Sequence, residues 1–210
     1  MRNILSETIC VCAAACVLTF ATGCQTDHQS SAQPTPAATQ TSAPPPTTTA
    51  APAVPTAATK AAPIRIKTGV TEGFTDKSGN AWLPDQGFAD GETIQRPDLT
   101  IANAADPRIY QAERYSMTKF THALPNGKYT VKLHFCETFE GISGPGERVF
   151  SFNVQGREFK DFDVWAKTGG SQRAYIETVP VEITGGQLVI TFTPSIENPE
   201  INGIEIIPQD

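Results

Sequence analysis

The sequence predicts an all-β sandwich for residues 64–210. Apolar and polar residues alternate in several short runs, which is the period-two pattern of half-buried strands. Clusters of Gly, Pro and Asn separate these runs, as in "PNG" at Pro125–Gly127 and "GG" at Gly185–Gly186. No run shows the period of an amphipathic helix. Several short strands joined by such turns are typical of a β-sandwich.

The clearest strand is "KYTVKLHF", from Lys128 to Phe135. Its apolar residues share one face and its polar residues share the other, so we expect His134 on the polar face to be solvated. Three further runs alternate in the same way: "VFSFNV" at 149–154, "QLVITF" at 187–192 and "INGIEII" at 201–207. A first strand at Ile64 and a last strand running almost to Asp210 are expected to pair. Residues 68–106 are rich in Gly, Asp and Asn and are expected to form mainly loops.

Residues 1–23 predict a secretory signal peptide. Arg2 supplies the positive end, and the apolar run "ICVCAAACVLTF" is shorter than the about 20 residues that a membrane-spanning helix needs. The following "ATGC" resembles the lipobox of bacterial lipoproteins, with Ala21 where Leu is usual. We therefore expect a lipid on Cys24 and an exported protein that is anchored to a membrane of the cell envelope, on the periplasmic or cell-surface side. Cleavage before Cys16 and plain secretion are the two alternatives.

Residues 24–63 predict a disordered linker after the lipidated cysteine. The segment consists largely of Ala, Thr, Pro, Ser and Gln, and it cannot bury enough apolar surface to fold. It would tether the domain at 64–210 to the membrane. In that domain Cys136 is the sole cysteine, so an intrachain disulfide is not available to it. We expect Cys136 to be a small buried hydrophobic residue.

Charge and motif spacing narrow the function. The net charge of −6 argues against nucleic acid, which requires a basic surface. Glu113, Glu137 and Glu140 are candidates for a glycosidase, but no spacing singles out an acid pair, so a hydrolase is a minor alternative. "DKSGN" at 76–80 has oxygen ligands at alternate positions but lacks the bidentate Glu of a calcium loop, which predicts a plain turn. We therefore expect no metal, no cofactor and no enzyme activity.

Four segments resemble the malectin domain, in its order and spacing. They are "DPRIYQAERY" at 106–115, "LPNGKYTVKLHFCETF" at 124–139, "RVFSFNVQGREFKDFDV" at 148–164 and "ENPEINGIEI" at 197–206. The resemblance covers essentially all of residues 64–208. It implies a jelly-roll-like β-sandwich of the galactose-binding-like type. It also implies carbohydrate binding without catalysis, with glycans or glucose-containing oligosaccharides as ligands and no cofactor.

The resemblance also implies a set of site residues, with departures from the family pattern. Tyr115 occupies the position of a tyrosine that contacts sugar in the family. Phe139 and Glu140 stand where the family has two adjacent aromatic residues, and Glu197 stands where the family usually has Asp. A further family tyrosine lies in the upstream loop, where Phe88 is the nearest aromatic residue. We expect Tyr115 and Phe139 to stack on a sugar while Glu197 accepts hydrogen bonds from its hydroxyl groups.

The residues themselves support a ligand site on loops at one end of the sandwich. Sugar recognition needs aromatic faces and a few fixed polar groups, and such residues sit best on loops that a rigid scaffold positions. We expect Tyr115, Phe139 and Glu197 to meet in one concave spot and Tyr110 to pack in the interior. We expect Glu113 and Arg114 to form a local ion pair or a loop clamp. The second hypothesis is a protein-interaction or envelope-scaffold domain that kept the sandwich and lost the sugar site.

Overall fold

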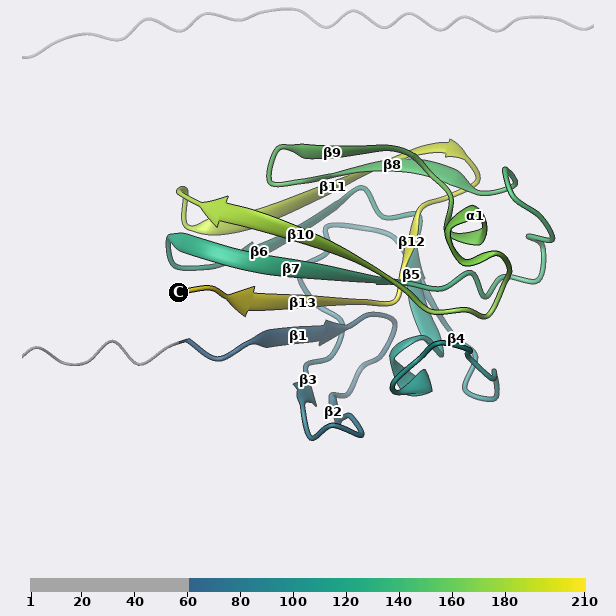
Figure 1. The fold of residues 1–210 in the computed structure, drawn as a ribbon, viewed down its shortest axis with the longest axis horizontal. Helices are drawn as coiled ribbons and strands as arrows, with labels where there is room; N and C mark the ends of the chain where they lie inside the picture. Colours follow the sequence, from purple (N-terminus) through teal and green to yellow (C-terminus); the bar gives the residue numbers. More distant parts are fainter. Residues whose placement is uncertain (1–60) are drawn as a thin grey trace, which may run out of the picture. The chain divides into compact units, whose positions relative to one another are not determined.

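The structure, a computed structural model, describes residues 61–210 (Figure 1). Two four-stranded antiparallel sheets form the sandwich. One has the order β1 (Ile64–Lys67), β13 (Gly203–Pro208), β7 (Gly127–Phe135) and β10 (Tyr175–Ile183). The other has the order β6 (Lys119–Ala123), β11 (Gln187–Ile196), β8 (Val149–Val154) and β9 (Arg157–Phe162). The predicted all-β sandwich is confirmed.

Smaller elements complete the fold. A three-stranded sheet has the order β12 (Glu200–Ile201), β5 (Ala112–Tyr115) and β4 (Glu92–Gln95), and β2 (Phe74–Thr75) pairs with β3 (Ala81–Trp82). The 3-10 helix η1 (Pro107–Ile109) precedes β5, and the short α-helix α1 (Val164–Thr168) follows β9. Short strands therefore interrupt the region 68–106 that we expected to be mainly loop. Within residues 61–210, no helix is long and apolar enough to cross a membrane.

The two large sheets share one apolar core. Val131, Leu133 and Phe135 of β7 face inward and meet Phe150 and Phe152 of β8, all of them at most 2% exposed. This is the side-chain set that the alternation of each strand places on one face. Burying this many aliphatic and aromatic side chains is the dominant stabilising term of the sandwich.

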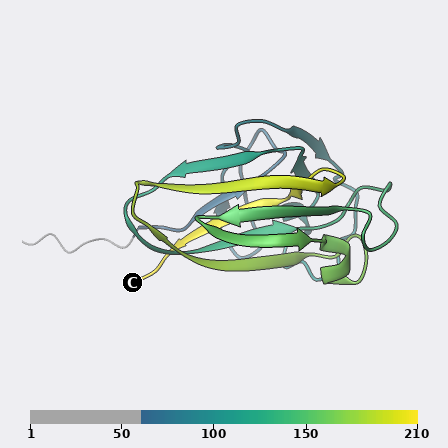
Figure 2. The same ribbon diagram turned by 90° about the horizontal axis from the view of Figure 1, so that it is seen from above.

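The first and last strands lie side by side, as predicted (Figures 1 and 2). The antiparallel register pairs Ile64 with Ile206 and Ile66 with Ile204. Because β1 and β13 are antiparallel, Ile64 and the end of β13 lie at the same end of the sandwich. The three-stranded sheet β12-β5-β4 lies toward the opposite end (Figure 1).

His134 is buried, and the expectation that it is solvated is wrong. Its Nδ1 atom lies 2.8 Å from the hydroxyl of Tyr110, and its Nε2 atom lies 3.0 Å from a carboxylate oxygen of Glu205. The ring of Trp82 on β3 packs edge-on against it, so a second layer covers this face of the sheet. Burial lowers the pKa of His134, and the neighbouring carboxylate of Glu205 partly offsets this effect by raising the pKa. Tyr110 packs in the interior, as the sequence analysis expected.

A buried ammonium group fixes β5 against the large sheet. The Nζ atom of Lys67, at the end of β1, donates to the carbonyl oxygens of Thr68, Ala112 and Asn202 at 2.5, 2.6 and 3.2 Å. Burial lowers the pKa of Lys67 to about 7, opposed first by the carboxylate of Asp85. Three acceptors match the three protons of the charged form, so the contacts favour the ammonium ion. One side chain thus joins the ends of β1, β5 and β12.

We expect Lys67→Met to destabilise the domain by about 3 kcal/mol, because it removes three hydrogen bonds of a buried ammonium group. The carbonyl of Thr68 loses its donor, whereas the carbonyls of Ala112 and Asn202 each keep one other donor. Urea denaturation of residues 61–210 measures the free energy of unfolding. Lys128→Met, at an exposed position on β7, is the matched control and should stay within about 0.5 kcal/mol of the wild type. Equal stability of the two variants would contradict a role for Lys67 in holding these strand ends.

Candidate functional site

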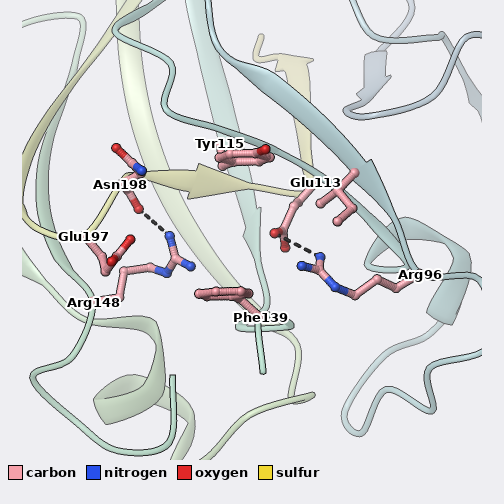
Figure 3. Close-up of a pocket in the computed structure, with 8 residues that line it drawn as sticks. Arg96, Glu113, Tyr115, Phe139, Arg148, Glu197 and Asn198 are labelled. Atoms are coloured by element: carbon pink, nitrogen blue, oxygen red, sulfur yellow. Dashed lines mark hydrogen bonds and ion pairs between the residues drawn. The ribbon is translucent and has the colours of Figure 1, made fainter. Parts of the chain in front are cut away.

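A pocket of about 250 Å³ lies beside the three-stranded sheet. Its walls include Tyr115, Phe139 and Glu197, which come from three distant segments of the chain (Figure 3). The structure therefore brings together the three residues that we expected in one concave spot. The pocket also contains Arg96 and Arg148, which the sequence analysis did not single out.

Strand β5 presents Tyr115 and Glu113 to the pocket from the same face, because residues two apart on a strand point the same way. β5 pairs Tyr115 with Glu92 of β4 on one side and with Glu200 of β12 on the other. The next residue, Ser116, has a left-handed φ of 59°, and its N–H donates to the carbonyl of Pro199 at 3.0 Å. The strand thus ends immediately after the tyrosine that it positions.

Phe139 lies in a turn four residues beyond the end of β7. Its backbone N–H donates to a carboxylate oxygen of Glu137 at 2.9 Å, and its carbonyl accepts from the N–H of Ile142 at 3.1 Å. Its side chain is 43% exposed. In Figure 3 the rings of Tyr115 and Phe139 are seen edge-on, on opposite sides of the pocket, with their flat faces toward the space between them.

Glu197 occupies a strained turn after β11. Its φ of 58° lies in the left-handed region, which a residue with a long side chain adopts only when the surroundings enforce it. A guanidinium nitrogen of Arg148 donates to the carbonyl of the next residue, Asn198, and holds this turn in place. The exposed carboxylate of Glu197 therefore reaches the pocket from a fixed backbone.

Two ion pairs lie in the walls and floor of the pocket. Arg148 Nε lies 2.7 Å from Glu137 Oε2, with side chains 5% and 1% exposed. Arg96 Nη1 lies 3.1 Å from Glu113 Oε1 and also donates to Thr138 Oγ1 at 3.0 Å. The hydroxyl of Thr138 in turn donates to Glu113 Oε2 at 2.6 Å. Additional hydrogen bonds of this kind are what a buried ion pair needs to offset its desolvation.

A third buried carboxyl group, Glu200, accompanies the two pairs. It is 0% exposed, and within residues 61–210 neither carboxylate oxygen has a hydrogen-bond partner. Burial raises the pKa of Glu200 well above 4.5, and the negative charges of Glu113 and Glu137 raise it further. A proton on Glu200 would leave one carboxylate for each of the two arginines and would balance the charges beneath the pocket.

The alternation of inward and outward residues along the strands could have identified these ion pairs. Arg148 stands two residues before the inward-facing Phe150 of β8. Glu137 stands two residues after the inward-facing Phe135 of β7. A charged residue in an apolar phase is buried, and a buried charge needs a partner. Two such residues of opposite sign on neighbouring strand ends predict an ion pair.

Two of the expected site residues lie outside the pocket. The ring of Phe88 packs on Phe120, with centroids 5.0 Å apart, and the guanidinium of Arg114 covers it. Glu140 is exposed in the turn after Phe139 and does not line the pocket.

Glu113 and Arg114 do not pair with each other, because consecutive residues of a strand point to opposite faces. Glu113 pairs with Arg96, and Arg114 pairs with Asp85 at 3.0 Å. The expected clamp exists, but with other partners. In the part of the chain that the structure describes, no cluster of His, Cys, Asp and Glu side chains could hold a metal ion. The segment 76–80 is the predicted turn, with Asp76 accepting from the N–H groups of Ser78 and Asn80.

Two aromatic residues and several fixed polar groups, on strand β5 and the loops beside it, thus line a pocket toward one end of an antiparallel β-sandwich. The family model of the malectin domain matches residues 63–204. The chain therefore belongs to the malectin domain family, and it carries a non-catalytic carbohydrate-binding module over these residues.

Relatives with similar sequences are multidomain proteins. A probable leucine-rich repeat receptor-like serine/threonine-protein kinase of Arabidopsis thaliana is 33% identical over 139 aligned residues, in an alignment that covers 57% of this chain and 14% of the kinase. Receptor-like protein 4 of Arabidopsis thaliana is 33% identical over 123 aligned residues, in an alignment that covers 55% of this chain and 20% of that protein. The chain thus spans a fifth or less of the length of these relatives.

Solved structures share the fold. A β-glucuronidase of Bacteroides uniformis aligns with a TM-score of 0.65 at 22% identity, over 71% of this chain and 18% of the enzyme chain. The ANXUR2 extracellular domain of Arabidopsis thaliana aligns with a TM-score of 0.62 at 19% identity, over 70% of this chain and 48% of that chain. At these identities the likeness concerns the fold.

We expect Glu200→Gln to stabilise the domain increasingly as the pH rises above 4.5. The folded state keeps a proton on Glu200 where the unfolded chain releases it, so the free energy of unfolding of the wild type falls with rising pH. Glutamine removes this term, which is on the order of 1 kcal/mol per pH unit. Urea denaturation at pH 5, 6.5 and 8 measures the difference.

Glu140→Gln, at an exposed position in the adjacent turn, is the matched control and should show no such trend. If Glu200→Gln is less stable than the wild type at every pH, Glu200 is ionised in the folded protein and the charge balance beneath the pocket is different.

Proposed function

We propose that the pocket binds one glucose-configured sugar unit of a glycan or oligosaccharide, without catalysis. The observation that carries this proposal is the placement of Tyr115 and Phe139, whose ring faces bound the pocket from opposite sides (Figure 3). Aromatic faces stack favourably on C–H-rich surfaces, and tyrosine adds a polar hydroxyl at the ring edge. A flat ligand with two apolar faces fits between them.

The two facing aromatic rings favour one sugar configuration. A pyranose with all-equatorial hydroxyl groups, such as glucose, presents axial C–H bonds on both faces and polar groups around its edge. An axial hydroxyl, as in galactose or mannose, would point toward one aromatic ring and lose its hydrogen bonds on binding. The pocket is therefore expected to prefer glucose over these epimers.

The polar groups of the pocket lie around the edge of the space between the rings. Glu113 and Glu197 supply acceptors, and in Figure 3 the guanidinium groups of Arg96 and Arg148 point into this space. Charge-assisted hydrogen bonds from such groups would hold ring hydroxyls. Desolvation of these hydroxyls offsets much of the gain, so we expect modest affinity.

Glucose-containing oligosaccharides are expected to bind the domain saturably in isothermal titration calorimetry, and galactose and mannose oligosaccharides more weakly. Phe139→Ala and Tyr115→Ala should each lower the affinity about tenfold or more, because each removes one stacking face. Ile176→Ala is the matched control, since its 44% exposed side chain resembles the 43% exposure of Phe139 but lies outside the pocket.

The second candidate is a protein-interaction or envelope-scaffold domain. The observation that favours it is Glu140, which stands where the family resemblance implies a second aromatic residue and which does not line the pocket. No binding of the wild type across a glycan array, together with a protein partner whose capture Phe139→Ala leaves intact, would favour this function over the lectin.

We propose further that the module is exported and lipid-anchored through Cys24. That cysteine, the signal peptide at 1–23 and the linker at 24–63 lie outside the described residues, apart from 61–63. Two observations support the proposal: "ATGC" resembles a lipobox, and the chain shares its fold with the ANXUR2 extracellular domain. Strands β4 and β5, which contribute lining residues to the pocket, lie toward the end of the sandwich opposite to Ile64 (Figure 1). A tether that joins the domain at Ile64 would therefore attach away from the pocket.

Metabolic labelling with a fatty-acid analogue tests the anchor. We expect label on the wild-type protein in the membrane fraction and none on Cys24→Ala, because the thiol is the attachment point. Cys16→Ala, which removes the rival site in the apolar run, should be labelled like the wild type. Equal labelling of Cys24→Ala and the wild type would remove this anchor from the proposal.

A further inference from the structure

The ring of Phe139 lies directly on Gly141. A Cβ atom built on Gly141 would meet Phe139 Cε1 at 2.5 Å, Cζ at 2.6 Å and Cδ1 at 3.2 Å. Separations below 3.0 Å are essentially never seen for real Cβ atoms. The aromatic side chain therefore occupies the space that any side chain at position 141 would need.

The backbone conformation at position 141 does not require glycine. Gly141 is absent from the residues with positive φ between 61 and 210, whereas neighbouring Gly146 has a φ of 85°. Every L-amino acid can adopt a backbone conformation with negative φ at the third position of a turn. What position 141 provides is therefore the absence of a side chain, and the group that uses the space is the ring of Phe139.

The backbone of Phe139 is fixed while its ring is held weakly. Glu137 and Ile142 hold its N–H and carbonyl through hydrogen bonds. The ring, in contrast, is 43% exposed and belongs to neither apolar core cluster of the described residues. The position of the Phe139 ring in the pocket wall thus depends on its contact with Gly141.

We propose that Gly141 is a positioning residue that seats the Phe139 ring in the wall of the pocket, opposite Tyr115. This inference rests on the proposed carbohydrate-binding function, because it assigns a role in that site. A methyl group at 141 would push the ring toward solvent, since the ring is the free end of an exposed side chain and can move without shifting the backbone. The fold would remain, and one stacking face would be lost.

The test compares Gly141→Ala with Gly144→Ala in the same loop. Gly144 is the matched control: its φ is not positive, and a Cβ there would meet Glu147 Oε1 at 3.6 Å, an ordinary contact. We expect both variants to keep the urea midpoint of the wild type. Gly141→Ala should lose about as much affinity for a gluco-oligosaccharide as Phe139→Ala, about tenfold, and Gly144→Ala should lose none.

A double-mutant cycle tests whether position 141 affects binding through the ring of Phe139. Phe139→Ala with Gly141→Ala should bind no more weakly than Phe139→Ala alone, because the ring through which position 141 acts is already gone. Additive losses would overturn the inference, since position 141 would then act by another route. A loss of folding stability in Gly141→Ala that accounts for the lost binding would overturn it as well.

Crystal structures of the wild type and Gly141→Ala without ligand separate this inference from the proposed function. We expect the Phe139 ring to leave the pocket wall in the variant while the backbone of residues 137–142 superimposes. An unchanged ring position would overturn the role of Gly141. If the ring moves but the wild type binds no sugar, the positioning role stands and the proposed ligand is wrong.

Discussion

The pocket depends on one carboxylate, that of Glu137, which connects two loops that are far apart in the sequence. One oxygen accepts from the backbone N–H of Phe139, and the other accepts from Nε of Arg148, which also holds the turn at Asn198. Both side chains are almost fully buried, so water does not compete for these bonds. Removing either partner would leave an uncompensated charge, which typically costs 3–5 kcal/mol, or roughly the stability of a marginal domain. The geometry of the walls is therefore coupled to the stability of the fold.

Burying charged groups beneath the pocket costs desolvation free energy, and the raised pKa of Glu200 favours a neutral acid there, which lowers this cost. Three glutamates share a low-dielectric space with two arginines, and the carboxyl group with no hydrogen-bond partner is the one whose pKa rises most clearly. A neutral third acid avoids a net negative charge there, whereas an ionised Glu200 would compete with Glu137 for Arg148. Arg96 and Arg148 each have a paired carboxylate, so their guanidinium groups can lie beside the pocket without giving it a large net positive charge.

Strand alternation predicted the sandwich, and the family resemblance predicted that three site residues meet in one pocket. Neither predicted the buried ion pairs that lie beside these residues. Alternation identifies strands such as β7 because one face of each strand is buried by the other sheet. It failed at His134, since the covering layer of β2, β3 and η1 comes from a region with little strand pattern. The family resemblance placed Tyr115, Phe139 and Glu197 in the pocket, and the same resemblance also suggested Glu140, which does not line it. Phe88 was chosen as the nearest aromatic residue in the sequence and packs on Phe120 instead. Ion pairs between residues such as Arg96 and Glu113 depend on strand order, which a linear pattern does not contain.

The two aromatic walls of the pocket differ in how firmly they are held, and this difference bears on recognition. Tyr115 stands on a paired strand between β4 and β12, so its position is set by ladder hydrogen bonds on both sides. Phe139 stands on a turn, with a ring that rests on a bare Cα and faces solvent. If the pocket binds a sugar as proposed, the firmly held Tyr115 with its polar neighbours would select the ring configuration, while the more exposed Phe139 would tolerate different linkages. We therefore expect the pocket to discriminate ring configuration more strongly than chain length.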